Sequence, residues 1–452
     1  MDEDEGWGSN LRALLALAGP IAVSQVAQTS LGFVDTVMVG RLGAGALAAV
    51  SIGVAVHYTA LMLALGTVMA VGPLASQAHG AGDAREVARY TRQGLWLATL
   101  LAPVVAVAEW SAPYWVHLLR QDPDVTPVIG EYLRAVSWSA WPFLAFSALR
   151  AWFESVGRPG PVTAIAVSGV GVNAIANYAF VFGHFGASAL GAVGAGYATS
   201  VSYGYLFLAL AAYALSNSGL RAYHVLDRLR RPAWAYLREL CRVGIPMGVS
   251  FSLEVGFFSA MGILVGQLGT VQLAAHQISL QMASLSFMLP LAISMAVSIR
   301  VGNLVGAGQP ARATEAGWLA VGVGGGIMVL SATAYLLVPD AIVALFLGEG
   351  ATVGEGLAVA GLAGGLLLLA GGFQVFDGVQ AVAAGSLRGL KDTFYPMVIG
   401  LISYWVIGLP LGYALMDAFA ARGLWMGLIA GLACASVALT LRWWRLSPKP
   451  AA

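Results

Sequence analysis

The stretch IPMGVSFSLEVGFFSAMGILVGQLG, from Ile245 to Gly269, is almost wholly apolar and carries one carboxylate, Glu254, near its middle. Crossing the hydrocarbon core of a bilayer takes about 20 residues in a helix, and this stretch is long enough. An acid at that depth costs roughly 2.5 to 3.5 kcal/mol on insertion scales, so Glu254 needs a partner. The stretch therefore predicts a membrane-spanning helix that holds a functional acid.

The composition extends this conclusion to the whole chain. The 452 residues are 59% hydrophobic and 10% charged, with a mean hydropathy of +0.79. A soluble domain carries about 25% charged residues, and here the apolar segments leave no room for one. Cys241 and Cys434 lie far apart in apolar segments, which does not favour a disulfide or a metal site. The acidic start MDEDE does not resemble a cleavable signal peptide. We expect an all-α polytopic membrane protein.

Apolar runs bounded by charged or Gly/Pro-rich breaks predict twelve transmembrane helices in two six-helix lobes. The spans are 11–39, 46–76, 88–112, 128–150, 160–183, 190–216, 237–266, 272–302, 312–338, 355–387, 394–417 and 422–445. Residues 1–216 form the predicted N-terminal lobe, 217–236 a basic cytoplasmic linker and 237–452 the C-terminal lobe. Nineteen Lys and Arg residues fall on one side and four on the other, so both termini are expected to be cytoplasmic.

The two lobes are related by an internal repeat. A shift of 226 residues aligns Pro20 with Pro246 and continues without a gap to Gly82 and Gly308, with twenty identities over sixty-three columns. Both copies start on the inner side, which predicts parallel repeats related by a pseudo-two-fold axis along the membrane normal. Transporters built this way place their site between or inside the lobes and rock one lobe against the other.

A second intramembrane acid, Asp377, is predicted at the same depth as Glu254. Glu254 lies twelve residues beyond Arg242, and Asp377 lies eleven residues before Arg388, which puts both roughly 16 to 18 Å from the inner surface. Two acids together in a low dielectric cannot both stay ionised, so they take up H⁺ unless a cation replaces it. A site that holds either one is what an antiporter needs.

The residues around these acids predict a substrate cavity for lipophilic organic cations, through charge and cation–π contact. Packing between helices is the alternative for the aromatic residues, and helix bridging is the alternative for Gln277 and Gln281. The candidates are Gln28, Ser250, Phe257, Met261, Gln277, Gln281, Phe373 and Gln380.

The first lobe carries its acid, Asp35, nearer the outer surface. Asn173 and Asn177 are four residues apart on one helical face at a similar depth, and so is Thr199. Four oxygen-bearing side chains at one level could hold Asp35 protonated or coordinate Na⁺. Hydrogen bonding between helices is the alternative role of the asparagines and Thr199.

Single prolines and histidines complete the candidates. Pro20 and Pro246 each remove a helix hydrogen bond and should bend their helices at matching places. His57 and His276 have no neighbour at ligand spacing and are interpreted as hydrogen-bonded packing groups.

Several motifs resemble the multidrug and toxic compound extrusion (MATE) family, closest to its NorM-type bacterial branch. They are GFVDTVMVGRLG from Gly32, AHGAGD from Ala78, the pair Asn173 and Asn177, FGHFGASALGAVGAGYAT from Phe182, SIRVGNLVGAG from Ser298 and VQAVAAGSLRGLKDT from Val379. The resemblance covers nearly the whole chain. It implies two six-helix lobes forming a V and export of organic cations and drugs in exchange for Na⁺ or H⁺.

The resemblance also implies residue roles. Asp35, Glu254 and Asp377 match the family's acids in helices one, seven and ten. Asn173, Asn177 and Thr199 match its polar cluster around the first of these acids, and Pro20 its bending proline. Where relatives often have a tyrosine four residues before the helix-ten acid, this chain has Phe373, so one hydroxyl ligand for Na⁺ is missing in the second lobe.

Together these features predict a secondary antiporter in the bacterial inner membrane that needs no cofactor beyond its coupling ion, H⁺ or Na⁺. Its expected contacts are organic cations and membrane lipids, not nucleic acid, and it is expected to be a monomer. The nearest alternative is a flippase for lipid-linked sugars, which would need a basic cavity. An enzyme is not expected, because no HExxH, GxSxG or intramembrane-protease motif is present.

Overall fold

The computed structural model describes residues 6–118, 126–225, 231–347 and 354–447. The acidic start, residues 1–5, and residues 226–230 of the predicted linker lie outside these ranges. Within the described ranges every regular element is a helix, and eleven helices are long and apolar enough to cross a membrane. The prediction of an all-α polytopic membrane protein is confirmed.

The helices divide into two compact units. One unit is Gly19–Val249, and the other is Ser250–Ala452 together with the N-terminal residues up to Ala18. The chain therefore changes unit inside two helices, α1 (Gly6–Gly40) and α10 (Trp234–Gln267), close to Pro20 and Pro246. Both helices continue through their prolines. The lobe boundaries at 216 and 237 stay a prediction.

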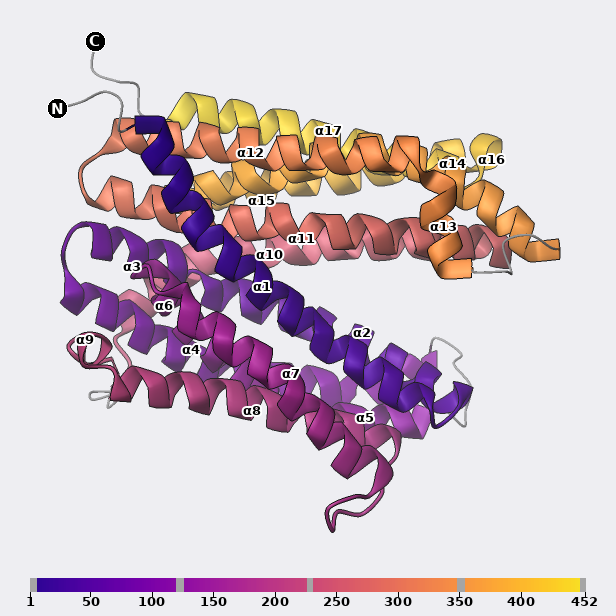
Figure 1. Ribbon diagram of the computed structural model, residues 1–452, viewed down its shortest axis with the longest axis horizontal. Coiled ribbons are helices and arrows are strands. Elements are labelled where there is room, and N and C mark those ends of the chain that lie inside the picture. The colour runs from indigo at the N-terminus through magenta and orange to yellow at the C-terminus, as the bar shows by residue number, and fades with distance from the viewer. Residues whose placement is uncertain (1–5, 119–125, 226–230, 348–353, 448–452) are drawn as a thin grey trace. The chain divides into compact units, whose positions relative to one another are not determined.

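The unit Gly19–Val249 is built around long helices that enclose α6 (Figure 1). α6 packs against α4 and α8, its Trp152 and Phe146 are fully buried, and an edge-to-face ring contact joins Phe143 of α6 to Tyr203 of α8. Its further helices are α2 (Ala44–Met69), α3 (Val71–Gly80), α4 (Ala84–Leu118), α5 (Thr126–Ser137), α6 (Ala140–Ser155), α7 (Pro159–Phe182), α8 (Ala192–Ser216) and α9 (Ser218–Arg221).

The other unit packs around α14, which lies beside α11, α12 and α17 (Figure 1). A Cβ at Gly385 of α14 would strike the backbone of Ser294 in α11, so this glycine permits the close approach of the two helices. The helices are α11 (Thr270–Gly306), α12 (Pro310–Leu337), α13 (Pro339–Leu347), α14 (Gly354–Gly389), α15 (Phe394–Gly400), the π-helical Leu401–Gly408, α16 (Leu409–Phe419) and α17 (Ala421–Leu446).

The internal repeat reappears in the backbone. Gly43, before α2, has φ 115° and ψ 171°, and Gly269, before α11, has φ 109° and ψ 172°. Gly82 and Gly308, before α4 and α12, have φ 76° and 71°. Both pairs are 226 residues apart, the shift that aligns the sequences. Positive φ strains residues with a side chain, which explains why glycine occupies these turns in both copies.

The predicted span 128–150 is divided into two helices. α5 ends at Ser137 and α6 begins at Ala140, so neither reaches the length of a membrane span. The Ser137 hydroxyl donates to the Arg134 carbonyl at 2.8 Å, and the Ser139 amide donates to the Val136 carbonyl at 2.8 Å. Such i−3 bonds compete with the regular α-helical pattern and account for the break.

Candidate functional site

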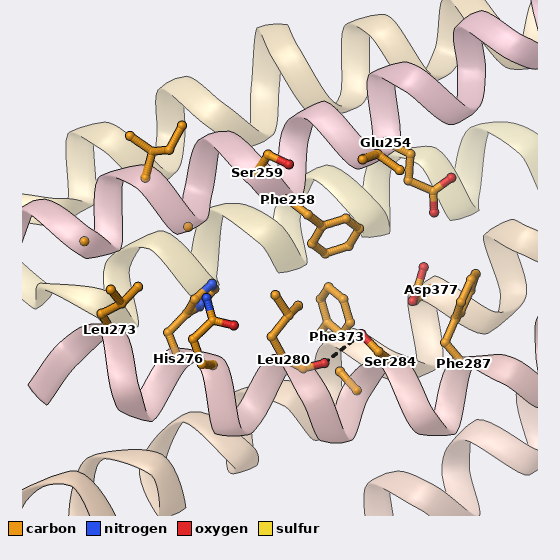
Figure 2. Close-up of a pocket in the computed structure, with 16 residues that line it drawn as sticks. Glu254, Phe258, Ser259, Leu273, His276, Leu280, Ser284, Phe287, Phe373 and Asp377 are labelled. Atoms are coloured by element: carbon orange, nitrogen blue, oxygen red, sulfur yellow. Dashed lines mark hydrogen bonds between the residues drawn. The ribbon is translucent and has the colours of Figure 1, made fainter. Parts of the chain in front are cut away.

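A cavity of about 590 Å³ lies in the unit that holds Ser250–Ala452, between α10, α11 and α14 (Figure 2). Glu254 from α10 and Asp377 from α14 lie at one end of it. Its wall also holds Phe258, Ser259, Gly262, Ile263, His276, Gln277, Leu280, Ser284, Phe287 and Phe373. Glu254 and Asp377, which were predicted to lie at the same depth, thus border a single chamber with a mostly apolar wall.

Gln380 connects the two acids. Its Nε2 donates to Glu254 Oε1 at 3.3 Å, and it also hydrogen-bonds Asp377. Asp377 is 4% exposed, and its Oδ1 is buried with no hydrogen-bond partner among the described residues. A buried, unpartnered carboxylate oxygen is costly, so a proton or a cation at this point would stabilise the site.

One fixed positive charge that acts on Glu254 is the guanidinium of Arg388. It is buried and interacts electrostatically with Glu254, but among the described residues no ion pair within 4.0 Å joins them. Its guanidinium donates to Ser294 Oγ at 3.1 Å and to the Ala384 carbonyl at 3.2 Å, and it lies 5.5 Å from the Phe251 ring centroid. Arg388 is therefore held by other groups and leaves the two acids open to a second cation.

A row of rings extends away from the acids; Phe258, Phe373 and His276 line the cavity, and Trp425 is buried behind them. Phe258 of α10 meets Phe373 of α14 edge to face at 5.8 Å, and Phe373 meets Trp425 of α17 at 5.7 Å. Trp425 meets the ring of His276, from α11, at 5.8 Å. Rings of this kind offer both apolar area and a negative face to a lipophilic cation.

The structure places two predicted cavity residues in the packed core instead. Phe257 and Met261 are both 0% exposed. Phe257 stacks on Tyr404 at 5.3 Å, and Met261 packs toward Gly412 of α16. The cavity side of α10 is one residue further along, at Phe258, because the polar face of Glu254 includes both the i+3 and the i+4 positions.

The remaining predicted cavity residues have separate positions. Phe373 and Gln277 line the cavity, and Gln380 lies behind the acids. Gln281 is exposed on α11 outside the described lining, and Ser250 is half-buried. Gln28 lies in the other unit, where its Nε2 donates to the Ser24 carbonyl at 3.2 Å.

In the unit Gly19–Val249 the structure brings Asp35 together with Asn173, Asn177 and Thr199. Asp35 Oδ1 accepts from Asn173 Nδ2 at 3.0 Å and from Asn177 Nδ2 at 2.6 Å. Asp35 Oδ2 accepts from Thr199 Oγ1 at 2.7 Å. All four side chains are at most 9% exposed. Three donors directed at one acid satisfy it in its ionised form.

The same cluster offers oxygen atoms to a cation. Asn173 Oδ1 and Asn177 Oδ1 are buried and have no hydrogen-bond partner among the described residues. Rotation of either amide would exchange its donor for an oxygen, as Na⁺ coordination beside Asp35 would need. The residues present therefore fit either a proton or Na⁺ at Asp35.

Two further buried acids were not found from the sequence: Glu154, whose Oε1 lies 2.7 Å from Arg150 Nε on α6, and Glu109. Glu109 Oε1 lies 2.6 Å from His57 Nδ1, and both side chains are buried between α2 and α4. Ser139 Oγ lies 3.5 Å from His57 Nε2. Glu109 falls near the end of the predicted span 88–112, where an acid is expected at the membrane interface. The sequence therefore contains no indication that Glu109 is buried.

Comparison with known proteins agrees with this geometry. A model of the MatE family matches residues 20–179 and 246–414. The chain is similar to proteins named "Probable multidrug resistance protein NorM". The one from Brucella suis biovar 1 (strain 1330) is 37% identical over 443 residues, covering 97% of this chain and 94% of the relative. The one from Pseudomonas putida is 38% identical over 441 residues, covering 97% and 95%.

Solved structures share the fold. The crystal structure of the eukaryotic MATE transporter AtDTX14 matches with a TM-score of 0.87 at 22% identity, over 98% of this chain and 97% of that one. An outward-facing multidrug resistance transporter of the same family matches with a TM-score of 0.84 at 19% identity, over 97% of each chain.

Proposed function

Because this chain belongs to the MATE family, we propose that it is a secondary antiporter that exports organic cations and drugs in exchange for H⁺ or Na⁺. The observation that carries the proposal is the cavity bordered by Glu254 and Asp377, with an unpartnered oxygen on Asp377. The names of the similar NorM proteins support drugs as the cargo.

The cavity supports an organic cation as its ligand. Two carboxylates supply negative charge at one end, and Phe258 and Phe373 supply apolar and aromatic surface beside them. Among the described residues that line the cavity, none is Lys or Arg. A cavity for a lipid-linked pyrophosphate would need basic groups, so the lining does not favour a flippase.

Exchange of a small ion for an organic cation is expected because, in the described part of the chain, the negative charge of Glu254 and Asp377 is not balanced by a bound basic side chain. With Arg388 held by Ser294 and the Ala384 carbonyl, the acids need a further cation or proton to be neutral. A small ion and an organic cation then compete for the same carboxylates. Binding of each must differ between the inward-open and outward-open states, because a ligand shifts an equilibrium only by its differential affinity.

We place the protein in the bacterial inner membrane with both termini in the cytoplasm, working as a monomer among membrane lipids. Alternating access through rocking of the two lobes, with bending at Pro20 and Pro246, completes the proposed cycle. Asp35 with Asn173, Asn177 and Thr199 is the proposed second ion site.

The test uses purified full-length protein in proteoliposomes loaded with an organic cation such as tetraphenylphosphonium. Efflux is followed first under an imposed pH gradient and then under an imposed Na⁺ gradient. We expect at least one gradient to accelerate efflux, and Glu254→Gln with Asp377→Asn to abolish the acceleration. Gradient-independent leakage, equal in wild type and the double variant, would overturn the proposal.

A further inference from the structure

The end of the cavity away from the acids contains a histidine fixed in one tautomer. Trp425 Nε1 donates to His276 Nδ1 at 3.1 Å. An indole N–H is a donor only, so Nδ1 must be the acceptor and the proton of the neutral ring must be on Nε2. His276 therefore presents an N–H group on the side of the ring opposite Trp425.

That N–H group has no protein acceptor. Nε2 of His276 is buried without a hydrogen-bond partner among the described residues, and the side chain is 1% exposed. Nε2 faces Gly262 of α10, since a Cβ built on that glycine would lie 3.7 Å from it. Both residues line the cavity. A buried donor without an acceptor is costly, so an acceptor brought by a ligand would stabilise this end.

The donor and the acids lie at opposite ends of the cavity. Gly262 is eight residues beyond Glu254 on α10, which corresponds to about 12 Å along the helix. Figure 2 shows His276 near Leu273 at one end, Glu254 and Asp377 at the other, and Phe258 and Phe373 between them. The chamber thus has an anionic end, an aromatic middle and a hydrogen-bond donor at its far end.

We propose that His276 Nε2–H is a substrate-binding donor that selects elongated organic cations with a neutral hydrogen-bond acceptor, such as a ketone, ether or hydroxyl oxygen, about 12 Å from the positive charge. The proposal rests on the proposed function, because it assumes that the cation is held by Glu254 and Asp377. Trp425 is a positioning residue here, since it acts by fixing the tautomer of His276.

Gln277 adds a second hydrogen-bonding side chain at the His276 end of the cavity. It follows His276 on α11, lines the same chamber and is exposed. Its carboxamide can donate to an oxygen or accept from a hydroxyl, so it tolerates several ligands. His276 Nε2–H can only donate, so it binds only a ligand atom that accepts a hydrogen bond, and it is the group that discriminates between ligands.

The test measures equilibrium binding to the full-length protein in detergent. The probes are a trimethylammonium ion carrying a methyl ketone at the end of an alkyl chain about 12 Å long, and its analogue with CH₂ in place of the carbonyl. The readout is the ratio of their two dissociation constants within each variant. The dissociation constant of the CH₂ analogue divided by that of the ketone should be roughly tenfold larger in the wild type than in the two variants described below.

Two variants remove the donor in different ways. His276→Phe keeps a ring against Trp425 but has no N–H. Gly262→Ala covers Nε2 with a methyl group at ordinary van der Waals distance and leaves the His276–Trp425 bond intact. Both are expected to lose the preference for the ketone. Gly326→Ala, on α12, has open space around its Cβ and serves as the matched control that keeps it.

The outcomes separate the two proposals. Loss of the ketone preference in both variants, or in Gly262→Ala alone if His276→Phe does not fold, supports the assignment. Tight binding of both cations with the same ratio in wild type and Gly262→Ala would overturn the His276 site and leave the proposed function standing. Failure of the wild type to bind either cation would overturn both.

Discussion

The two acidic sites differ in how their carboxylates are satisfied. Asp35 receives three hydrogen bonds of 2.6 to 3.0 Å from Asn173, Asn177 and Thr199. Asp377 has one oxygen that no described residue contacts by a hydrogen bond, and it borders a cavity of about 590 Å³. Both carboxylate oxygens of Asp35 thus accept hydrogen bonds from their own unit, whereas Asp377 Oδ1 accepts none from the described residues.

This difference suggests a division of labour between the sites. Donors directed at Asp35 stabilise its ionised form and leave only a small ion or a proton as an additional ligand. The Glu254–Asp377 site has a chamber beside it and can hold a ligand with an aromatic or alkyl body. We therefore assign ion binding to both sites and cargo binding to the second.

The largest expected effect concerns cargo affinity. Asp377→Asn combined with Glu254→Gln removes the charge that attracts an organic cation, so its dissociation constant should rise at least 30-fold. Asp35→Asn should change it by less than about threefold, because Asp35 does not contact the cargo. Isothermal titration with tetraphenylphosphonium measures both. Equal losses in the two cases would contradict the division of labour.

Stability should respond in the opposite order. Asp35→Leu leaves three buried donors without their acceptor and should cost about 3 kcal/mol or more. Asp377→Leu replaces a poorly satisfied buried acid by an apolar side chain and should be neutral or stabilising. Thermal unfolding in detergent, followed by tryptophan fluorescence, compares them. Greater destabilisation by Asp377→Leu than by Asp35→Leu would show that Asp377 is the better satisfied acid.

Single hydrogen-bond deletions should show the same contrast on a smaller scale. Thr199→Val removes a 2.7 Å bond to a buried carboxylate and should cost about 1 to 2 kcal/mol. Gln380→Leu removes a 3.3 Å bond to Glu254 and the bond to Asp377, and should still cost under about 1 kcal/mol, because Asp377 is already poorly satisfied. The same unfolding assay serves, with Ser259→Ala as an exposed control in the second unit. A larger loss for Gln380→Leu would reverse the ranking.

The smallest expected effect tests the coupling ion. Phe373 lines the cavity beside Asp377, and Phe373→Tyr adds a hydroxyl oxygen there. Oxygen ligands favour Na⁺, so the apparent Na⁺ affinity should rise by a few fold. Competition between Na⁺ and tetraphenylphosphonium in wild type and variant measures it. No change in the variant would place Na⁺ away from this part of the cavity.

The proximity of Asp35 to Asn173, Asn177 and Thr199 could be predicted from the sequence, because depth and helical spacing suffice for it. Asn173 and Asn177 are four residues apart and so share a face of α7, and the span boundaries put Asp35 and Thr199 at their level. Each group has one short side chain, so little freedom remained once the helices were placed. The 226-residue shift also aligns Gly43 with Gly269, and the structure adds that the turns at these two glycines match.

The cavity was predicted less completely because its wall depends on small rotations of helices. A shift of one residue exchanges Phe257 for Phe258, and periodicity does not resolve such a shift. His276 was interpreted as a packing group, since its role depends on Trp425, which is 149 residues away along the chain. The break between α5 and α6 depends on local serine hydrogen bonds that hydropathy does not register.

The central claim is that a small ion and an organic cation occupy the same acids in turn. The most direct measurement is the release of H⁺ or Na⁺ when tetraphenylphosphonium binds to the purified protein in weakly buffered detergent solution. We predict release in step with cation binding in the wild type, and none for Glu254→Gln combined with Asp377→Asn. Stoichiometric cation binding by the wild type with no ion released would contradict the account.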